Sequence, residues 1–460
     1  MTRAGAKGAV RPRLIGDGTV VPLLPEGEAP YTNLDYAASA PALREVAEAM
    51  AEFLPWYASV HRGAGFKSQV ASAAYDGARE SLRRFVGARP DDTVVITRHT
   101  TDALNLIARG LPEDAGVITF AFEHHANLLP WRGRRFRHLP IPPGPEEMLQ
   151  ALEMALEEEP AGLVAVTGAS NVTGEIPPLA RVKELCRRHG ARLLVDAAQL
   201  APHRPIDMAA TGIDYLALSG HKLYAPYGAG ALVGRADWLD GSPPYLQGGG
   251  AVEFVTADGV LWKDGPDRHE AGSPNVVGAV ALGVACETLS ALGMPALVAE
   301  EAELHAQALR RLRAVPGLTL YSTWDFEHPH IGVLTFNLRG YHHSKVAAIL
   351  SAEYGIGVRD GCFCAHPLML HLMEVDGAQA DRVRREILQG RRIDVPGGVR
   401  ASLGLDSRAE DVDRLADALA EISLEGPRWT YQADDEAGTY APSPDPRPWP
   451  QLPPGLRLIR

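Results

Sequence analysis

Short apolar runs alternate along much of the chain with longer segments of helical period. The runs predict buried strands. They lie at residues 93–97, 117–120, 163–166, 191–196 and 215–218. Apolar positions recur at helical spacing in the segments 145–158 and 179–189, and Gly190 follows the second segment as glycine often follows a helix. This order predicts an α/β fold with right-handed crossovers and a mainly parallel sheet covered on both faces.

The regular alternation stops near residue 234. The stretch 235–275 shows no clear secondary-structure signal, and so long an irregular segment is more often functional than accidental. From residue 295 a charged helical segment leads into a second, smaller α/β unit. We therefore expect four parts. They are an N-terminal arm over 1–30, a large domain over 31–294 with 31–45 packing on the small domain, a small C-terminal domain over 295–425, and a Pro-rich tail over 426–460, either disordered or bound to the surface.

Composition narrows the class of protein. The chain has 460 residues, 46% hydrophobic and 22% charged, which is typical of a globular protein in water. Its net charge of −12 argues against nucleic-acid binding and provides no basic surface for a membrane. The most apolar helical segment, 276–292, contains Glu287 and several small residues, as expected of a buried helix. Four cysteines and the lack of an apolar leader segment favour the reducing cytoplasm.

Two of the predicted strands end in residues that can carry chemistry. The strand 215–218 is followed by Ser219-Gly-His-Lys222, and the strand 191–196 ends in Asp196. Ligands of open α/β sheets bind at such strand ends, where desolvation lowers the pKa of a lysine amine and makes it a candidate Schiff-base former. Pyridoxal phosphate needs such a lysine for its aldehyde and a carboxylate for its ring nitrogen. A surface lysine and a helix-capping aspartate are the alternative interpretation.

Five motifs extend this pattern. In chain order they are Glu123-His-His-Ala-Asn127, Ser170-Asn-Val-Thr-Gly174, Val195-Asp-Ala-Ala-Gln199, Ser219-Gly-His-Lys222 and Ala271-Gly-Ser-Pro-Asn275. With them the chain resembles the class V aminotransferase family, which are fold-type I pyridoxal-phosphate enzymes, and within it the group II (SufS-type) cysteine desulfurases. The resemblance runs from about residue 31 to residue 424. It implies a homodimer in which the segment around Ser273 contacts the phosphate of the neighbouring subunit.

The resemblance also implies roles for individual residues. His124 would stack over the cofactor ring, Asn171 would bond the ring hydroxyl or the bound carboxylate, and Arg400 would hold the substrate α-carboxylate. Thr100 and Thr101 stand at a predicted helix start, where free N–H groups and the helix dipole favour a phosphate, although both could be simple caps. The expected cofactor-binding residues are Thr100, Thr101, His124, Asn171, Asp196, Gln199, Ser219, His221, Lys222 and Ser273, and the expected substrate-binding residues are His61, Asn171, Arg359 and Arg400.

One short loop contains two cysteines, Cys362 and Cys364. Cys364 matches the nucleophile in the family pattern Arg-x-Gly-x-x-Cys-Ala, whereas Cys362 is extra and departs from that pattern. Desulfuration needs a thiolate near the substrate sulfur, and Arg359 and His366 could help to form it. Residues two apart in an extended loop point the same way, so Cys362 could receive or relay the sulfur, or the two thiols could be a redox pair.

These observations predict a cysteine desulfurase that converts L-cysteine to L-alanine, captures the sulfur as a persulfide on Cys364, and uses Lys222 and His124 as its other catalytic residues. A sulfur-acceptor protein is a possible partner; nucleic acid and membrane are not expected. The alternatives are another class V enzyme (a C–S or selenocysteine lyase, or an aminotransferase of specialised metabolism) and a catalytically silent scaffold. No metal is expected, because neither the His124-His125 pair nor Cys362-x-Cys364-x-His366 has a complete zinc ligand set.

Overall fold

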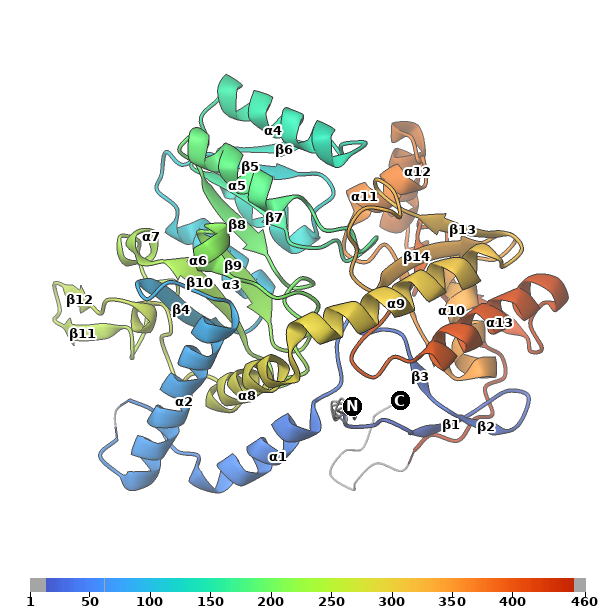
Figure 1. Ribbon diagram of the computed structural model, residues 1–460, viewed down its shortest axis with the longest axis horizontal. Coiled ribbons are helices and arrows are strands. Elements are labelled where there is room, and N and C mark those ends of the chain that lie inside the picture. Colours follow the sequence, from blue (N-terminus) through green and yellow to red (C-terminus); the bar gives the residue numbers. More distant parts are fainter. Residues whose placement is uncertain (1–13, 62, 451–460) are drawn as a thin grey trace, which may run out of the picture.

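The computed structural model describes residues 14–61 and 63–450, and a seven-stranded sheet forms its larger part (Figure 1). The strand order is β4-β10-β9-β8-β7-β5-β6. The strands are β4 (Asp92–Thr97), β5 (Val117–Phe120), β6 (Phe136–Leu139), β7 (Leu163–Thr167), β8 (Arg192–Asp196), β9 (Tyr215–Ser219) and β10 (Gly230–Arg235). The five adjacent strands β9, β8, β7, β5 and β6 run parallel to one another. Strand β10 is antiparallel to both of its neighbours, β9 and β4. The connection 220–229 is too short for a crossover, so β10 returns antiparallel. The predicted α/β fold with a mainly parallel sheet is confirmed.

Helices cover both faces of this sheet, and successive strand residues pack into different cores. Val94 and Leu216 belong to the core under one group of helices, and Val95 and Ala217 to the core under α3. This is the two-residue period of a strand buried on both faces. The helices of the first face are α1 (Arg44–Phe53), α2 (Phe66–Phe85), α4 (Pro145–Glu158), α5 (Leu179–Arg188), α6 (Met208–Thr211) and α8 (Val276–Leu292); α3 (Thr100–Gly110) and α7 (Ala236–Asp240) cover the second.

A second, antiparallel sheet forms the smaller unit, drawn in orange and red in Figure 1. Its order is β13-β14-β17-β16, and its strands are β13 (Leu318–Tyr321), β14 (Val333–Leu338), β16 (Arg359–Gly361) and β17 (Gly398–Ser402). Its helices are α9 (Met294–Arg313), α10 (His343–Tyr354), α11 (His366–Leu372), α12 (Gly377–Leu388) and α13 (Ala409–Glu425). This unit has its own core, around Phe336, Leu350 and Leu419.

The N-terminal part of the chain packs on this smaller unit. Strand β3 (Thr32–Asn33) pairs in parallel with β15 (Ile356–Gly357), and Leu34 belongs to the core of the smaller unit. Before it, β1 (Val20–Pro22) and β2 (Glu28–Pro30) form a hairpin. The boundaries proposed for the four parts of the chain stay predictions, and residues 1–13 of the predicted arm lie outside the described residues.

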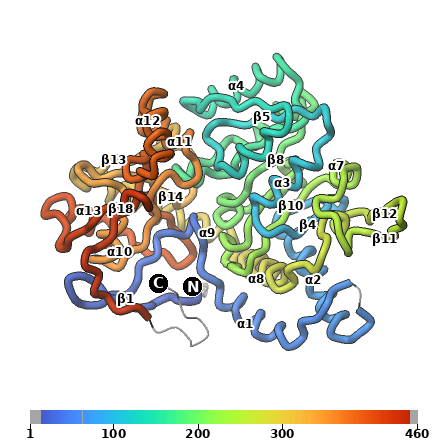
Figure 2. The backbone as a smooth tube through the Cα atoms, turned by 180° about the vertical axis from the view of Figure 1, so that it is seen from behind, coloured from blue at the N-terminus to red at the C-terminus, as the bar shows by residue number. Residues whose placement is uncertain are grey.

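The described part of the tail, 426–450, is ordered on the surface. It forms a hairpin of β18 (Tyr431–Asp434) and β19 (Thr439–Pro442) that lies against α10 (Figure 2). Tyr431 Oη donates to Glu353 Oε1 over 2.8 Å, and the backbone N–H of Trp429 donates to the same oxygen over 3.1 Å. Residues 426–450 therefore follow the surface-bound alternative for the tail. Residues 451–460 lie outside the described residues.

The stretch expected to be irregular contains a hairpin. Its strands are β11 (Val252–Val255) and β12 (Val260–Trp262), and it projects from the body beyond β10 and α7 (Figure 1). Further along, α8 is a largely buried helix, as predicted. Among the described helices none is by itself long and apolar enough to cross a membrane; α8 and α9 pass that test only as a pair, which is bent by 78°.

Candidate active site

A cavity of about 630 Å³ lies where the carboxyl ends of the large sheet face the smaller unit. The predicted site residues that line it are Thr100, Thr101, His124, Asn171, Asp196, Gln199, Ser219, His221, Lys222, Arg359, Cys364 and Arg400. His61 and Ser273 are not among its lining residues. His61 lies near α2, where its Nε2 is 3.0 Å from Asp76 Oδ1, and Ser273 is exposed on the loop before α8. The structure thus brings together all but two of the predicted residues.

Lys222 and Asp196 lie at the ends of neighbouring parallel strands. Asp196 is the last residue of β8 and is 4% exposed, and its carboxylate accepts the backbone N–H of Ala198 over 3.0 Å. Burial raises the pKa of Asp196, opposed by that hydrogen bond and by Lys222. Burial lowers the pKa of Lys222 to about 8, with Asp196 opposing this shift and Arg400 adding to it. An amine with such a pKa is partly unprotonated near neutral pH, as a Schiff-base-forming lysine must be.

Hydroxyl groups and a helix N-terminus form one end of the cavity. Helix α3 begins at Thr100, directly after β4 and its short turn. The backbone N–H of Thr100 donates to Ser219 Oγ over 2.8 Å, and the two hydroxyl oxygens are 2.7 Å apart. Thr101 follows on the same turn and also lines the cavity. Hydroxyl donors at the positive end of a helix dipole favour an anion such as a phosphate.

His124 follows β5 and presents a neutral ring to the cavity. Its Nδ1 accepts the backbone N–H of Ala126 over 3.0 Å, which places its proton on Nε2. Burial lowers its pKa to about 3, and the charge of Lys222 adds to the shift. The preceding Glu123 fixes this segment, because its two carboxyl oxygens accept from the backbone N–H of Thr167 and from Asn127 Nδ2, each over 2.8 Å. Burial raises the pKa of Glu123 to about 8.

Two arginines of the smaller unit line the cavity and share one carboxylate. Arg400, which is 3% exposed, donates from Nη1 to the carbonyl of Asn171 over 2.9 Å and from Nη2 to Asp35 Oδ1 over 3.4 Å. Arg359 Nη2 is 2.9 Å from Asp35 Oδ2. The Nε of Arg400 is buried and has no partner among the described residues. One carboxylate cannot satisfy two guanidinium groups, so this corner retains the capacity to bind a second carboxylate.

The cysteine loop forms the side of the cavity contributed by the smaller unit. Phe363 (φ 51°) and Cys364 (φ 54°) both adopt the left-handed region, and Ala365 N–H donates to the Cys362 carbonyl over 2.9 Å. This is the pattern of a type I′ turn. Each non-glycine residue in the left-handed region carries conformational strain of about 1–3 kcal/mol. The Phe363 carbonyl accepts from Asn171 Nδ2 over 2.7 Å. The large sheet thus helps to hold the turn that presents Cys364.

Comparison with known proteins identifies the family. The model of the aminotransferase class-V family matches residues 32–415. The chain belongs to this family. Relatives named cysteine desulfurase, from Escherichia coli O127:H6 and Shigella sonnei, are each 37% identical over 406 residues, covering 85% of this chain and 93% of theirs. The predicted membership is confirmed.

Solved structures of cysteine desulfurases share the fold of this chain. An apo structure from Thermococcus onnurineus has a TM-score of 0.75 at 31% identity and covers 85% of this chain and 94% of its own. An Escherichia coli enzyme has a TM-score of 0.72 at 32% identity and covers 86% and 95%. A NifS-like protein from Rickettsia africae, 17% identical with a TM-score of 0.68, shares the fold.

Three residues that the sequence did not single out belong to the candidate site. Asp35 links the two arginines, Phe363 lies 5.0 Å below the Arg400 guanidinium, and Glu123 joins the ends of β5 and β7. Glu123 is the first residue of the motif Glu123-His-His-Ala-Asn127, but the sequence did not indicate its hydrogen bond to the end of β7. The roles of Asp35 and Phe363 depend on contacts with distant parts of the chain, which leave no local signal.

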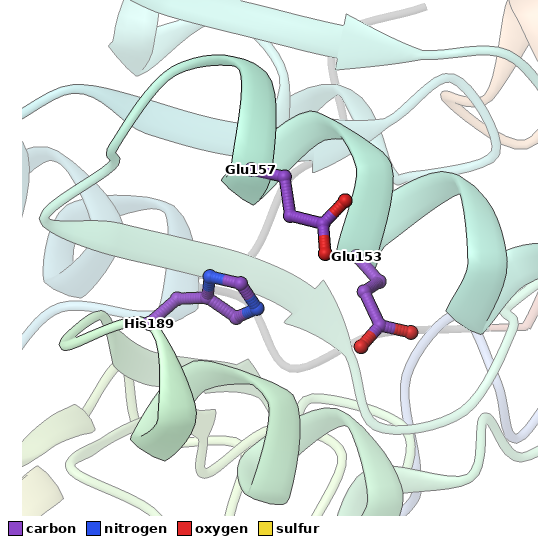
Figure 3. Close-up of side chains that lie close together, drawn as sticks. All are labelled: Glu153, Glu157 and His189. Carbon is purple, nitrogen blue, oxygen red and sulfur yellow. The ribbon is translucent and has the colours of Figure 1, made fainter.

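One group of possible metal ligands occurs elsewhere in the described residues. Glu153 and Glu157 on α4 face His189 at the end of α5 (Figure 3). Glu153 already pairs with Arg188 over 2.9 Å, and none of the three lines the cavity. An acidic surface group of this kind occurs commonly without an ion, so we assign it no role.

Proposed function

We propose that this member of the aminotransferase class-V family is a pyridoxal-phosphate-dependent cysteine desulfurase, which converts L-cysteine to L-alanine and captures the sulfur as a persulfide on Cys364. One observation carries the proposal: Lys222, Asp196 and Cys364 line a single cavity. The first two suit the cofactor and the third suits the substrate sulfur. Relatives that carry the name cysteine desulfurase over most of the chain support it.

The residues present fit the cofactor. The cavity volume lies within the range of about 300–1,000 Å³ usual for ligand pockets. Lys222 would bind the aldehyde, Asp196 the ring nitrogen, and Thr100 and Ser219 the phosphate, while the neutral ring of His124 is free to cover the pyridine face. Burial raises the pKa of Asp196, and the charge of Lys222 opposes this shift. A protonated ring nitrogen would be a second cation that favours the ionised carboxylate. Asn171, Gln199 and His221 would complete the surroundings.

The substrate carboxylate would bind at the arginine corner. Arg400 is fixed by the Asn171 carbonyl and lies over the Phe363 ring, so its guanidinium is already oriented. Its Nε lacks a partner among the described residues, which marks an unfilled donor. Arg359 is half-exposed and paired with Asp35, so it can turn toward an incoming carboxylate at small cost.

The residues of this chain then divide the reaction between them. Bound pyridoxal phosphate withdraws electrons from the substrate Cα and so weakens its bonds. Lys222, with its amine free, would move a proton at the substrate Cα. Cys364 attacks the substrate sulfur as a thiolate; the substrate C–S bond breaks as the new S–S bond forms, and the substrate carbon takes up a proton. Alanine leaves and Cys364 carries the sulfur.

We also propose a homodimer in the cytoplasm that passes sulfur to an acceptor protein. The hairpin β11–β12 exposes apolar side chains, with Phe254 at 65% and Leu261 at 62% exposure. Apolar side chains grouped on one projecting element usually mark an interface. His61 and Ser273 lie outside the cavity of their own chain, which is expected if they serve the site of a partner subunit. The four cysteines are free thiols, as suits a reducing compartment.

Product analysis with free L-cysteine tests the function. The enzyme should form alanine and a protein-bound persulfide, and Lys222→Ala should lose turnover by at least about 100-fold. Cys364→Ala should bind L-cysteine, seen as a change in the visible spectrum, yet form no alanine. Pyruvate with free sulfide would instead identify a lyase, and normal alanine formation by Cys364→Ala would refute the assigned nucleophile. Arg187→Ala, in an exposed ion pair with Glu184 on α5, is the control and should resemble the wild type.

A further inference from the structure

A second cysteine, two residues before the proposed nucleophile, contacts one member of a histidine pair. Cys362 Sγ is 3.0 Å from His366 Nε2. His366 Nδ1 is 3.1 Å from His125 Nε2, the ring planes are 7° apart and the ring centroids are 5.0 Å apart. The three side chains form a continuous chain of contacts that the proposed reaction at Cys364 does not use.

The hydrogen-bond pattern fixes which ring nitrogens of His125 and His366 carry protons. His125 Nε2 accepts the backbone N–H of His366 over 3.2 Å, so this nitrogen carries no proton. Its contact with His366 Nδ1 therefore requires the proton to be on Nδ1. Burial lowers the pKa of both histidines, which keeps the rings neutral. A neutral His366 protonated at Nδ1 has a bare Nε2, directed at the Cys362 thiol.

This arrangement pairs a thiol with a general base. Burial raises the pKa of the Cys362 thiol, and the neighbouring Cys364 adds to that shift, so the resting group keeps its proton. A thiol of this kind becomes a nucleophile only when a base removes its proton, and His366 Nε2 is in place to do so. His125 holds the His366 ring in the required tautomer.

Only Cys364 of the two neighbouring cysteines lines the main cavity, and Cys362 is not among the described residues that line it. His366, the partner of Cys362, lines a second cavity of about 220 Å³ between α11 and α12, whose walls are mostly apolar and include Met369 and Ile387. A sulfur on Cys362 would therefore lie beside His366, the residue that borders this second cavity.

We propose that Cys362 is a second sulfur carrier, which receives the outer sulfur of the Cys364 persulfide and holds it beside the α11–α12 cavity. His366 Nε2 takes the Cys362 proton, the Cys362 thiolate attacks the outer sulfur, a new S–S bond forms on Cys362, and the Cys364 S–S bond breaks. The proton returns from His366 to the Cys364 thiolate. The transfer exchanges one persulfide for another and needs no oxidant. It rests on the proposed desulfurase reaction.

Tandem mass spectrometry can locate the sulfur on each cysteine. The wild-type holoenzyme is mixed with L-cysteine in the absence of an acceptor and quenched with an alkylating agent at increasing times, and alanine is measured in the same samples. The sulfur should appear first on Cys364 and then on Cys362. In Cys362→Ser it should stay on Cys364. In His366→Gln its arrival on Cys362 should slow by at least about 100-fold, the usual contribution of a general base.

Matched variants separate this proposal from the one on which it rests. His371→Gln changes an exposed histidine of the same helix and should leave the order and rate of labelling unchanged. Alanine formation with sulfur confined to Cys364 in the wild type would overturn the relay alone. The absence of both alanine and persulfide would overturn the desulfurase function, and the relay with it. Sulfur on Cys362 in Cys364→Ser would show direct attack by Cys362 and would also overturn the relay.

Discussion

The backbone N–H of His125 donates a hydrogen bond of 2.8 Å to the carbonyl oxygen of Cys364. His125 follows β5 of the large sheet, whereas Cys364 belongs to the smaller unit. Asn171, which follows β7, makes the second such contact by donating to the Phe363 carbonyl. The position of the Cys364 thiol in the cavity is therefore set by the large sheet as well as by its own loop, and any shift between the two units would move it.

Thiol accessibility gives the first prediction. Cys364 is exposed and Cys362 half-buried, whereas Cys186 and Cys286 are wholly buried. Burial raises the pKa of Cys186 to about 12 and also raises that of Cys286. Iodoacetamide should therefore modify Cys364 first and Cys362 more slowly, and should reach the other two only after unfolding, as measured by peptide mass spectrometry over time. Early modification of Cys286 in the folded protein would contradict the packing of α8.

The pKa of Lys222 gives the second prediction. Burial lowers it to about 8, and only the unprotonated amine can attack an aldehyde. The rate at which cofactor-free protein takes up pyridoxal phosphate should rise about tenfold per pH unit below pH 8 and level off above it. Stopped-flow absorbance measures this rate. A profile that keeps rising toward pH 10 would show that Lys222 titrates as an ordinary lysine.

The same shift predicts a change in stability. The amine titrates near pH 8 in the folded cofactor-free protein and near 10.5 in the unfolded chain. Between these values the unfolded chain binds more protons, so the free energy of unfolding rises with pH across that window. Below pH 8 the amine is charged in both states, and the folded protein bears the full destabilisation of a buried charge. Urea titrations of the cofactor-free protein should show this rise, and Lys222→Met should remove it. An identical pH dependence in the two proteins would contradict the assignment.

Much of the site could be predicted because buried strands have a clear sequence pattern. A short apolar run followed by polar residues identifies a strand and its carboxyl end, and parallel strands bring those ends to one edge. Asp196, Lys222 and Thr100 were found in this way, and all line the cavity. The resemblance supplied Cys364 and Arg400, which lie on the smaller unit and have no comparable pattern of their own.

What could not be predicted depends on contacts between distant parts of the chain. Asp35 and Arg400 are 365 positions apart, and nothing near either residue indicates the pair. The β11–β12 hairpin was missed for a different reason. Its turn contains Asp258-Gly259, a known hairpin signal, but its strands expose apolar side chains instead of alternating. Strands whose apolar side chains face a second molecule, as we propose for this hairpin, lack the usual alternation of apolar and polar residues.

The hairpin gives a prediction for assembly. Leu261→Asp places a charge on the apolar surface that we propose faces a second copy. Burying a leucine contributes about 1.5–3 kcal/mol, so the dimer should weaken by at least about tenfold. Light scattering over a dilution series measures this change, and activity should fall with it if His61 and Ser273 serve the partner site. Leu424→Asp, at a position 72% exposed on α13, is the control. A fully active monomer would refute the shared site.

Arg400 gives the last prediction, which concerns the substrate carboxylate. Burial lowers its pKa to about 10, opposed by Asp35, so the guanidinium stays charged at neutral pH. A hydrogen bond to a charged group is worth about 1.5–3 kcal/mol, so Arg400→Gln should raise the KM for L-cysteine by roughly ten- to a hundredfold. The value of kcat should fall less, because we propose that the group binds the carboxylate and takes no part in proton transfer. Arg428→Gln removes a solvent-exposed pair with Glu421 and should change neither constant. If the KM of Arg400→Gln stays at the wild-type value in a folded, cofactor-loaded protein, the carboxylate is held by Arg359, the remaining guanidinium that lines the cavity beside Asp35.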